Sequence, residues 1–124
     1  MGADRRRSAA LALVALLLGA DLATAQNLTT ERLTGEALFG GATLIDPPPG
    51  EPAGTHAYLT ITGAAARRMF DAMSGPVRND ACQPGWRTKR AGHLTCSLGR
   101  RASEAQCGVA LLLARGELAP GRPC

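Results

Sequence analysis

The chain has 124 residues, with 14 Lys and Arg against 10 Asp and Glu, and only two Phe, one Tyr and one Trp. This length allows one compact domain and excludes a multidomain protein. A formal net charge of +4 and a single Trp do not provide the basic, aromatic-rich surface that nucleic-acid binding uses, so no nucleic-acid partner is expected.

Residues 1–25 have the three parts of a secretory signal peptide. Three arginines at positions 5–7 precede an apolar stretch over residues 9–20, and Ala23-Thr24-Ala25 supplies small residues before Gln26. The apolar stretch is shorter than the about 20 residues that span a bilayer as a helix, so cleavage is favoured over a membrane anchor. We expect a periplasmic or secreted protein that spans residues 26–124 as a single domain, without stable membrane insertion. The paired arginines leave Sec and twin-arginine export open, with Sec favoured because small residues follow them.

Residues 26–54 predict an extended lead-in followed by a proline-rich loop. The first part has no sustained period, and residues 42–45 are short and apolar enough for a brief strand. Asp46-Pro47-Pro48-Pro49-Gly50-Glu51-Pro52 excludes a helix or an interior strand, because each proline lacks an amide donor and has a fixed φ. This segment is expected to be a stiff, polyproline-like loop.

A strand followed directly by a helix is predicted next. Residues 55–62 alternate apolar and polar side chains in a segment rich in β-branched residues, which indicates a half-buried strand. Thr62 is placed to cap a helix over residues 63–74. Its apolar stripe of Ala66, Met69, Phe70 and Met73 follows the helical period. Because Met69 and Met73 lie on this apolar stripe, we expect them to pack in the core rather than to bind a soft metal together with His56.

Residues 75–92 show no convincing period and predict a long loop. The segments 93–98 and 106–113 alternate again and predict an antiparallel hairpin, and residues 114–124 predict an irregular tail pinned to the body. Residues 55–124 thus form the expected core, an α+β domain with one helix packed on a small antiparallel sheet.

The four cysteines, Cys82, Cys96, Cys107 and Cys124, predict two disulfides, because an even number in a small exported protein is typical of a crosslinked fold. A metal site is not expected, since no C-x-x-C pair occurs and the histidines are far apart in sequence. Three pairings are open. Loop length favours Cys82 with Cys96 and Cys107 with Cys124, each closing a loop of ordinary size.

Catalytic motifs are missing from the sequence. No G-x-S-x-G or S-x-x-K segment occurs, and the acidic residues are scattered rather than paired. No cofactor motif occurs either. The protein is therefore expected not to be an enzyme. A small hydrolase centred on His56, with Asp71 as a possible spatial partner, is kept as a third hypothesis.

Candidate binding residues cluster in the predicted long loop, where Trp86 stands beside Arg87, Lys89 and Arg90. Trp and Arg are enriched at binding hot spots, and no acidic residue occurs between Asp80 and Glu104. A solvated basic face, with Trp86 closing the core, is the plainer interpretation. The first functional hypothesis is a non-catalytic binding or regulatory module that docks an anionic envelope component or protein through this loop.

A secreted inhibitor of a hydrolase, such as a proteinase or a cell-wall enzyme, is the second hypothesis. A stiff loop on a crosslinked body loses little entropy on docking, which is how such inhibitors gain affinity. Two segments of this chain meet that description, residues 46–51 and residues 83–90.

Overall fold

The structure is a computed structural model that describes residues 27–124. The predicted signal peptide lies outside the described residues. The chain divides into two units, Met1–Thr30 and Glu31–Cys124, and the architecture below is that of the second.

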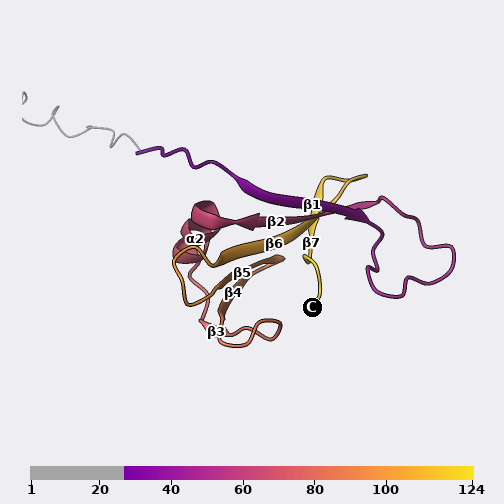
Figure 1. The fold of residues 1–124 in the computed structure, drawn as a ribbon. Coiled ribbons are helices and arrows are strands. Elements are labelled where there is room, and N and C mark those ends of the chain that lie inside the picture. The colour runs from indigo at the N-terminus through magenta and orange to yellow at the C-terminus, as the bar shows by residue number, and fades with distance from the viewer. Residues whose placement is uncertain (1–26) are drawn as a thin grey trace, which may run out of the picture. The chain divides into compact units, whose positions relative to one another are not determined.

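Seven antiparallel strands and one helix form the second unit, which confirms the α+β prediction (Figure 1). In chain order they are β1 (Thr34–Gly40), β2 (His56–Thr62), α2 (Gly63–Ala72), β3 (Arg78–Asn79), β4 (Arg87–Ala91), β5 (Leu94–Leu98), β6 (Ala105–Leu112) and β7 (Glu117–Ala119). The spatial order is β1-β2-β6-β5-β4-β3, and β7 pairs with the C-terminal half of β6. The sheet therefore has β1 at one edge and β3 at the other.

The strand-to-helix passage forms where the sequence predicts it. Helix α2 begins at Gly63, whose φ of 73° is readily adopted only by glycine. Thr62 takes the N-cap position but makes no side-chain cap bond. Its carbonyl oxygen instead accepts a hydrogen bond from Thr34 Oγ1 at 2.9 Å, which ties the helix start to β1.

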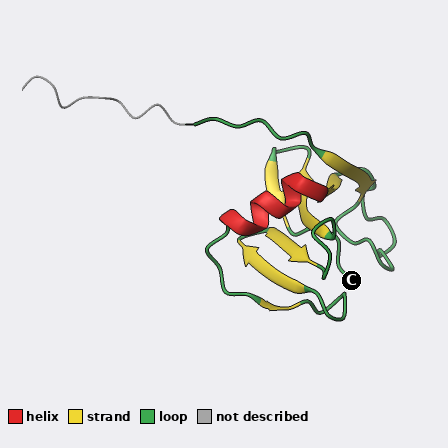
Figure 2. Ribbon diagram, turned by 60° about the vertical axis from the view of Figure 1, so that its left-hand side comes forward, coloured by secondary structure: helices red, strands yellow, loops and turns green. Residues whose placement is uncertain are grey.

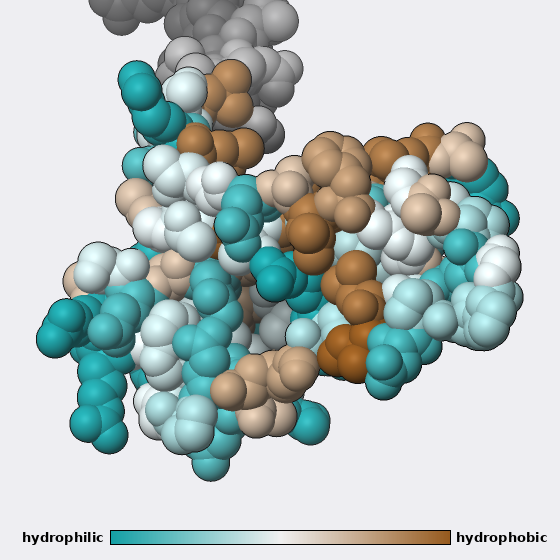
Figure 3. All heavy atoms as spheres, turned by 45° about the vertical axis from the view of Figure 1, so that its right-hand side comes forward, coloured by the Kyte–Doolittle hydropathy of each residue, from teal (hydrophilic) through white to brown (hydrophobic). Residues whose placement is uncertain are grey.

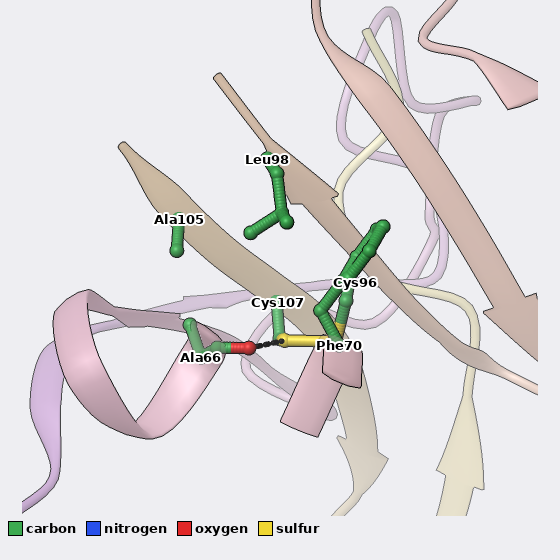
Figure 4. Close-up of a cluster of buried hydrophobic side chains, with 6 residues drawn as sticks. All are labelled: Ala66, Phe70, Cys96, Leu98, Ala105 and Cys107. Atoms are coloured by element: carbon green, nitrogen blue, oxygen red, sulfur yellow. Dashed lines mark hydrogen bonds between the residues drawn. A yellow bond between two sulfur atoms is a disulfide. The ribbon is translucent and has the colours of Figure 1, made fainter. Parts of the chain in front are cut away.

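Helix α2 crosses one face of the sheet, as Figure 2 shows, and covers the main core. Ala66 and Phe70 from the helix pack against side chains of β5 and β6 (Figure 4). The full buried cluster comprises Ala66, Phe70, Cys96, Leu98, Ala105 and Cys107. Met69 and Met73 lie partly buried against it, which confirms that they fill the core.

The predicted disulfide pairing is wrong, because the bonds join Cys82 to Cys124 and Cys96 to Cys107. Cys96 and Cys107 are direct partners in the β5–β6 register, so their side chains share the face beneath the helix. Cys82 lies in the loop after β3 and pairs across the opposite face, where it cannot reach Cys96. Alternation within strands, rather than loop length, decides the pairing.

Further segments differ from expectation. Residues 34–40, expected to belong to an extended lead-in outside the 55–124 core, form strand β1 of the sheet, and residues 117–119 of the expected irregular tail form β7. Residues 42–45 form bends rather than a strand, and the hydroxyl of Tyr58 donates a hydrogen bond of 2.7 Å to the carbonyl oxygen of Gly41 beside them. The expected long loop over residues 75–92 contains β3 and β4. Strand β4 escaped detection because its sequence RTKRA is polar on both faces, so it has no hydrophobic alternation.

The C-terminal residues 120–124, named the strap here, lie against the sheet face opposite the helix. Gly121 approaches the β6 backbone so closely that an added Cβ would lie 2.9 Å from the carbonyl carbon of Gly108. The guanidinium of Arg122 pairs with Glu36 of β1 at 3.1 Å, and Cys124 is bonded to Cys82. The strap is therefore pinned to the body, as the predicted tail was expected to be.

Candidate functional site

Strand β4 distributes the predicted binding residues between the two faces of the sheet. Lys89 is the register partner of Cys96 and so faces the helix, and Arg87, two residues earlier, lies on the same side. Arg90 is the partner of Thr95 and points to the strap side. Arg87 and Lys89 therefore do not share a surface with Arg90.

Lys89 stabilises the end of helix α2. Its Nζ donates hydrogen bonds to the carbonyl oxygens of Phe70 and Met73, at 3.1 and 2.8 Å, and lies 4.6 Å from the centroid of the Phe70 ring. The last carbonyl groups of a helix lack partners within the helix, and a cation at this end also matches the helix dipole. Lys89 thus has an internal role that occupies its charge.

Trp86 is half-buried and rests on the turn between β5 and β6. A Cβ added to Gly99 would lie 2.8 Å from Cε2 of the indole, so only glycine leaves room for the ring. The backbone of Trp86 accepts a hydrogen bond from the amide of Asp80 at 3.0 Å. Trp86 therefore closes the loop between β3 and β4 and leaves part of its ring exposed.

A cavity of about 520 Å³ opens on the strap side of β3 and β4. It is lined by Pro76, Arg78, Asn79, Asp80, Ala81, Cys82, Thr88, Arg90, Thr95 and Cys124. We name it the arginine cavity. Figure 3 shows that the lower part of the visible face, where β3, β4 and their connecting loop lie, is mostly hydrophilic, whereas apolar side chains gather above it.

Two arginines converge on the arginine cavity. Arg78 lies directly opposite Thr88 in the register, so Arg90 is its diagonal neighbour on the same face, at a backbone separation of about 7 Å. Both side chains belong to exposed residues. Within residues 27–124, neither forms an ion pair, whereas Arg67, Arg68, Arg101, Arg115 and Arg122 all do. The two guanidinium groups thus remain available to an external anion.

Asp80 lines the cavity, and both oxygens of its carboxylate accept hydrogen bonds. Its carboxylate accepts hydrogen bonds from Ser97 Oγ and from the amides of Cys82 and Gln83 at 2.8 and 3.0 Å. Partial burial disfavours the charged form, but these bonds outweigh it and hold the pKa of Asp80 below its ordinary value. The hydroxyl of Thr88 lies 3.0 Å from Ser97 Oγ and extends this network to β4.

Sequence analysis identified Arg90 but missed Arg78. Strand β3 has only two residues, which is too short for any periodic signal. Residues 87–90 form a strand, so Thr88 and Arg90 point to one side of the sheet and Arg87 and Lys89 to the other. The sequence alone does not show this, because it does not identify β4 as a strand. The signal that pairs Arg78 with Arg90 is therefore the β3–β4 register.

His56 lies beside a second cavity of about 380 Å³, next to Tyr58 and the strap. Its Nδ1 is 2.8 Å from Thr55 Oγ1, and its ring stacks on Tyr58 with centroids 5.7 Å apart. Burial, together with the nearby Glu51 carboxylate, raises the pKa of the Tyr58 phenol. Asp71 instead pairs with Arg67. Over residues 27–124, no hydrogen bond or ion pair joins His56 to an acid, and no cluster of three metal-ligating side chains occurs.

No protein-family model, no curated protein and no solved structure matches this chain. In the described part of the chain, no helix is long and apolar enough to cross a membrane. The two disulfides are typical of proteins that work in oxidising compartments outside the cytoplasm.

Proposed function

We propose that this protein is an exported, non-catalytic binding or regulatory module that captures an anionic group of an envelope component or protein in the arginine cavity. Its location is periplasmic or secreted. The observation that carries the proposal is the convergence of Arg78 and Arg90, both without an ion-pair partner in residues 27–124, on one cavity. The sequence suggested docking through the whole basic loop. The proposal places docking in the arginine cavity, which only one face of that segment lines.

The chemistry of the cavity suits a carboxylate, sulfate or phosphate group. Guanidinium groups bind such groups with two parallel hydrogen bonds, which gives both strength and orientation. The hydroxyl of Thr95 adds a neutral hydrogen-bonding group beside the arginines, whereas the hydroxyl of Thr88 already donates to the carbonyl oxygen of Cys96. Because Asp80 is already hydrogen-bonded to Ser97 and two amides, its negative charge is partly compensated and opposes the ligand less.

Capture from envelope extract tests the proposal. The oxidised protein should retain an anionic partner at low salt and release it at about 0.5 M salt, where screening is strong. Arg78→Glu/Arg90→Glu should reduce retention at least about tenfold, which is about 1.4 kcal/mol. The matched control, Arg67→Glu/Arg115→Glu, makes the same charge change outside the cavity and should retain the partner. Equal retention by the cavity variant, or salt-insensitive capture, would contradict the proposal.

A secreted hydrolase inhibitor is the second candidate, and the proline-rich loop favours it. The Glu51 carboxylate accepts hydrogen bonds from the amide and hydroxyl of Thr43, at 3.2 and 2.9 Å. This brace closes the base of the loop and leaves Pro47 to Gly50 exposed. A loop fixed before docking loses less entropy on binding.

The inhibitor hypothesis predicts slower turnover when the protein is added to periplasmic or extracellular hydrolases. Thr43→Val should weaken that inhibition because it removes the hydroxyl that braces the loop, whereas Arg78→Glu/Arg90→Glu should not. An unaffected panel of proteinases and cell-wall enzymes counts against this candidate. It leaves the arginine cavity proposal untouched.

A further inference from the structure

The two edges of the sheet differ in how they are protected. Edge strand β3 has two residues, one of them charged, and gives way at once to a loop. Edge strand β1 has seven residues, pairs with β2 along its whole length, and contains neither Lys, Arg nor Pro. Short length, positive charge and proline are the devices that keep sheet edges from pairing with other chains. Strand β1 uses none of them.

The single charge on β1 is neutralised within the chain. Glu36 pairs with Arg122 of the strap at 3.1 Å, on the face opposite the helix. The edge therefore presents unpaired backbone groups without net charge, which favours the addition of another strand.

The helix-side face of the sheet stays apolar up to this edge. Phe39, Ala57, Leu111 and Leu118 are consecutive register partners across β1, β2, β6 and β7. Helix α2 covers the face near Ile61 and Cys107, so this row lies beyond it. Phe39 is 66% exposed and Leu118 is 56% exposed. The exposed ring of Phe39 thus stands on the same edge that lacks a pairing partner.

Gly35 leaves the same edge without a side chain at its position. An added Cβ would lie 1.9 Å from the carbonyl oxygen of Thr60, so the position must be glycine. Gly35 shares the helix-side face with Phe39, four residues away on the same strand. Aromatic side chains that cover a cross-strand glycine are a known means of stabilising sheet edges.

We propose that β1 is a homodimerisation edge, along which two copies pair antiparallel about a two-fold axis at Ala37. This register pairs all seven residues of β1 with those of the second copy. It places each Phe39 opposite the Gly35 of the other copy and each Glu36 opposite Leu38. Centring the axis on Glu36 would set two carboxylates against each other, and centring it on Leu38 would leave the first two strand residues unpaired. An isologous contact of this kind forms a closed dimer.

The interface is modest in size. Two seven-residue strands and two phenylalanine rings bury less than the about 1,600 Å² of a standard interface. We therefore expect a reversible dimer whose population rises with concentration across the micromolar range.

Sedimentation velocity of the exported, oxidised protein tests the proposal. The wild type should shift from monomer to dimer between about 10 and about 500 µM, the range expected of a small interface. Ala37→Lys and Ala37→Glu each place like charges opposite each other at the axis, so each variant alone should be monomeric. An equimolar mixture should recover the dimer because the charges then attract. Ala64→Lys, which adds the same charge on the exposed face of α2, should dimerise like the wild type.

A monomeric wild type over the whole range would overturn the proposal. So would a persistent dimer in Ala37→Lys, or a mixture that stays monomeric. A second measurement does not depend on any variant. In a sample that mixes isotope-labelled and unlabelled wild type, nuclear Overhauser contacts should join the Phe39 ring to Gly35 of the other copy, since these residues are about 13 Å apart within one strand. Their absence from a dimeric sample places the interface elsewhere and also overturns the proposal.

Failure here is distinguishable from failure of the arginine cavity, since β1 and β3 are opposite edges of the sheet. Ala37→Lys should retain the anionic partner, and Arg78→Glu/Arg90→Glu should retain the dimer.

Discussion

The two faces of the sheet are held by different means. On the helix side, Cys96 and Cys107 are almost completely buried, and their disulfide links neighbouring strands only 11 residues apart in sequence. On the strap side, Cys82 and Cys124 are exposed, and their disulfide closes a separation of 42 residues. The first bond is part of the core, whereas the second attaches a peripheral segment. The buried core therefore lies on one face, and both cavities lie on the other.

The strap contributes residues to both cavities on the sheet face opposite the helix. Pro120, Gly121 and Pro123 line the cavity beside His56, and Cys124 lines the arginine cavity. A change in the strap should therefore alter both cavities while leaving the helix side intact. This difference between the faces can be tested by breaking each attachment in turn.

The largest expected effects come from the two disulfides. Mild reduction should open Cys82–Cys124 first, because a reductant reaches exposed sulfur atoms directly. Cys82→Ser/Cys124→Ser should lower the free energy of unfolding by about 4 kcal/mol on the chain-entropy model. The amide spectrum should change around the strap and both cavities while the signals of α2 persist. Alkylation with mass spectrometry and urea denaturation measure the two effects.

The matched comparison is Cys96→Ala/Cys107→Ala. Its shorter loop contributes about 3 kcal/mol on the same model, but the buried sulfur atoms pack against Ala66 and Phe70, so lost packing adds to the loss. We expect disturbed signals throughout α2, β5 and β6. If the buried disulfide were reduced first, or if both variants disturbed the same residues, the contrast between the two faces would be wrong.

Lys89→Met should have the next largest effect, confined to the helix side. It removes two hydrogen bonds to the carbonyl oxygens of Phe70 and Met73 and a cation–π contact. The expected loss is about 2 kcal/mol in the free energy of unfolding, since hydrogen bonds to charged groups contribute about 1.5–3 kcal/mol. Arg87 lies on the same strand and is exposed, so Arg87→Met should lower the free energy of unfolding by less than about 0.5 kcal/mol. Similar losses in both variants would contradict the capping role of Lys89.

Asp80→Asn should have the smallest effect, on the strap side, and it should depend on pH. The pKa of Asp80 is lower in the folded protein than its ordinary value of 3.8. Its carboxylate therefore stabilises the fold fully above that value, and this contribution is lost as the pH falls through the folded pKa. The variant should be less stable than wild type by about 1 kcal/mol at pH 7. Urea denaturation from pH 7 down to pH 2 should show the difference shrinking, and a constant difference would exclude the carboxylate as its source.

Local patterns predicted the parts of the fold that depend on neighbours in sequence. The β2–α2 passage and the β5–β6 hairpin both formed, because residues such as Ile61, Phe70 and Leu98 repeat with the period of their own element. The hairpin also contained the correct disulfide. Cys96 and Cys107 belong to the two alternating segments that predicted this hairpin, yet loop length was preferred over register.

The candidate site was less predictable for the opposite reason. Strand β4 is polar on both faces, so its period was invisible, and Lys89 and Arg90 were grouped although they point in opposite directions. Arg78 belongs to a strand of two residues that only pairing with β4 defines. No pattern within either segment indicates that these arginines share a cavity.

By itself the sequence determined that the cysteines would form two bonds, that one helix would follow one strand, and that the basic residues would collect near β4. Only the tertiary structure decided which cysteines pair, which face each arginine occupies, and which sheet edge is left open. The physical reason is that alternation along a strand determines which face of the sheet a side chain occupies. Its neighbours on that face depend instead on the register with strands that are distant in sequence.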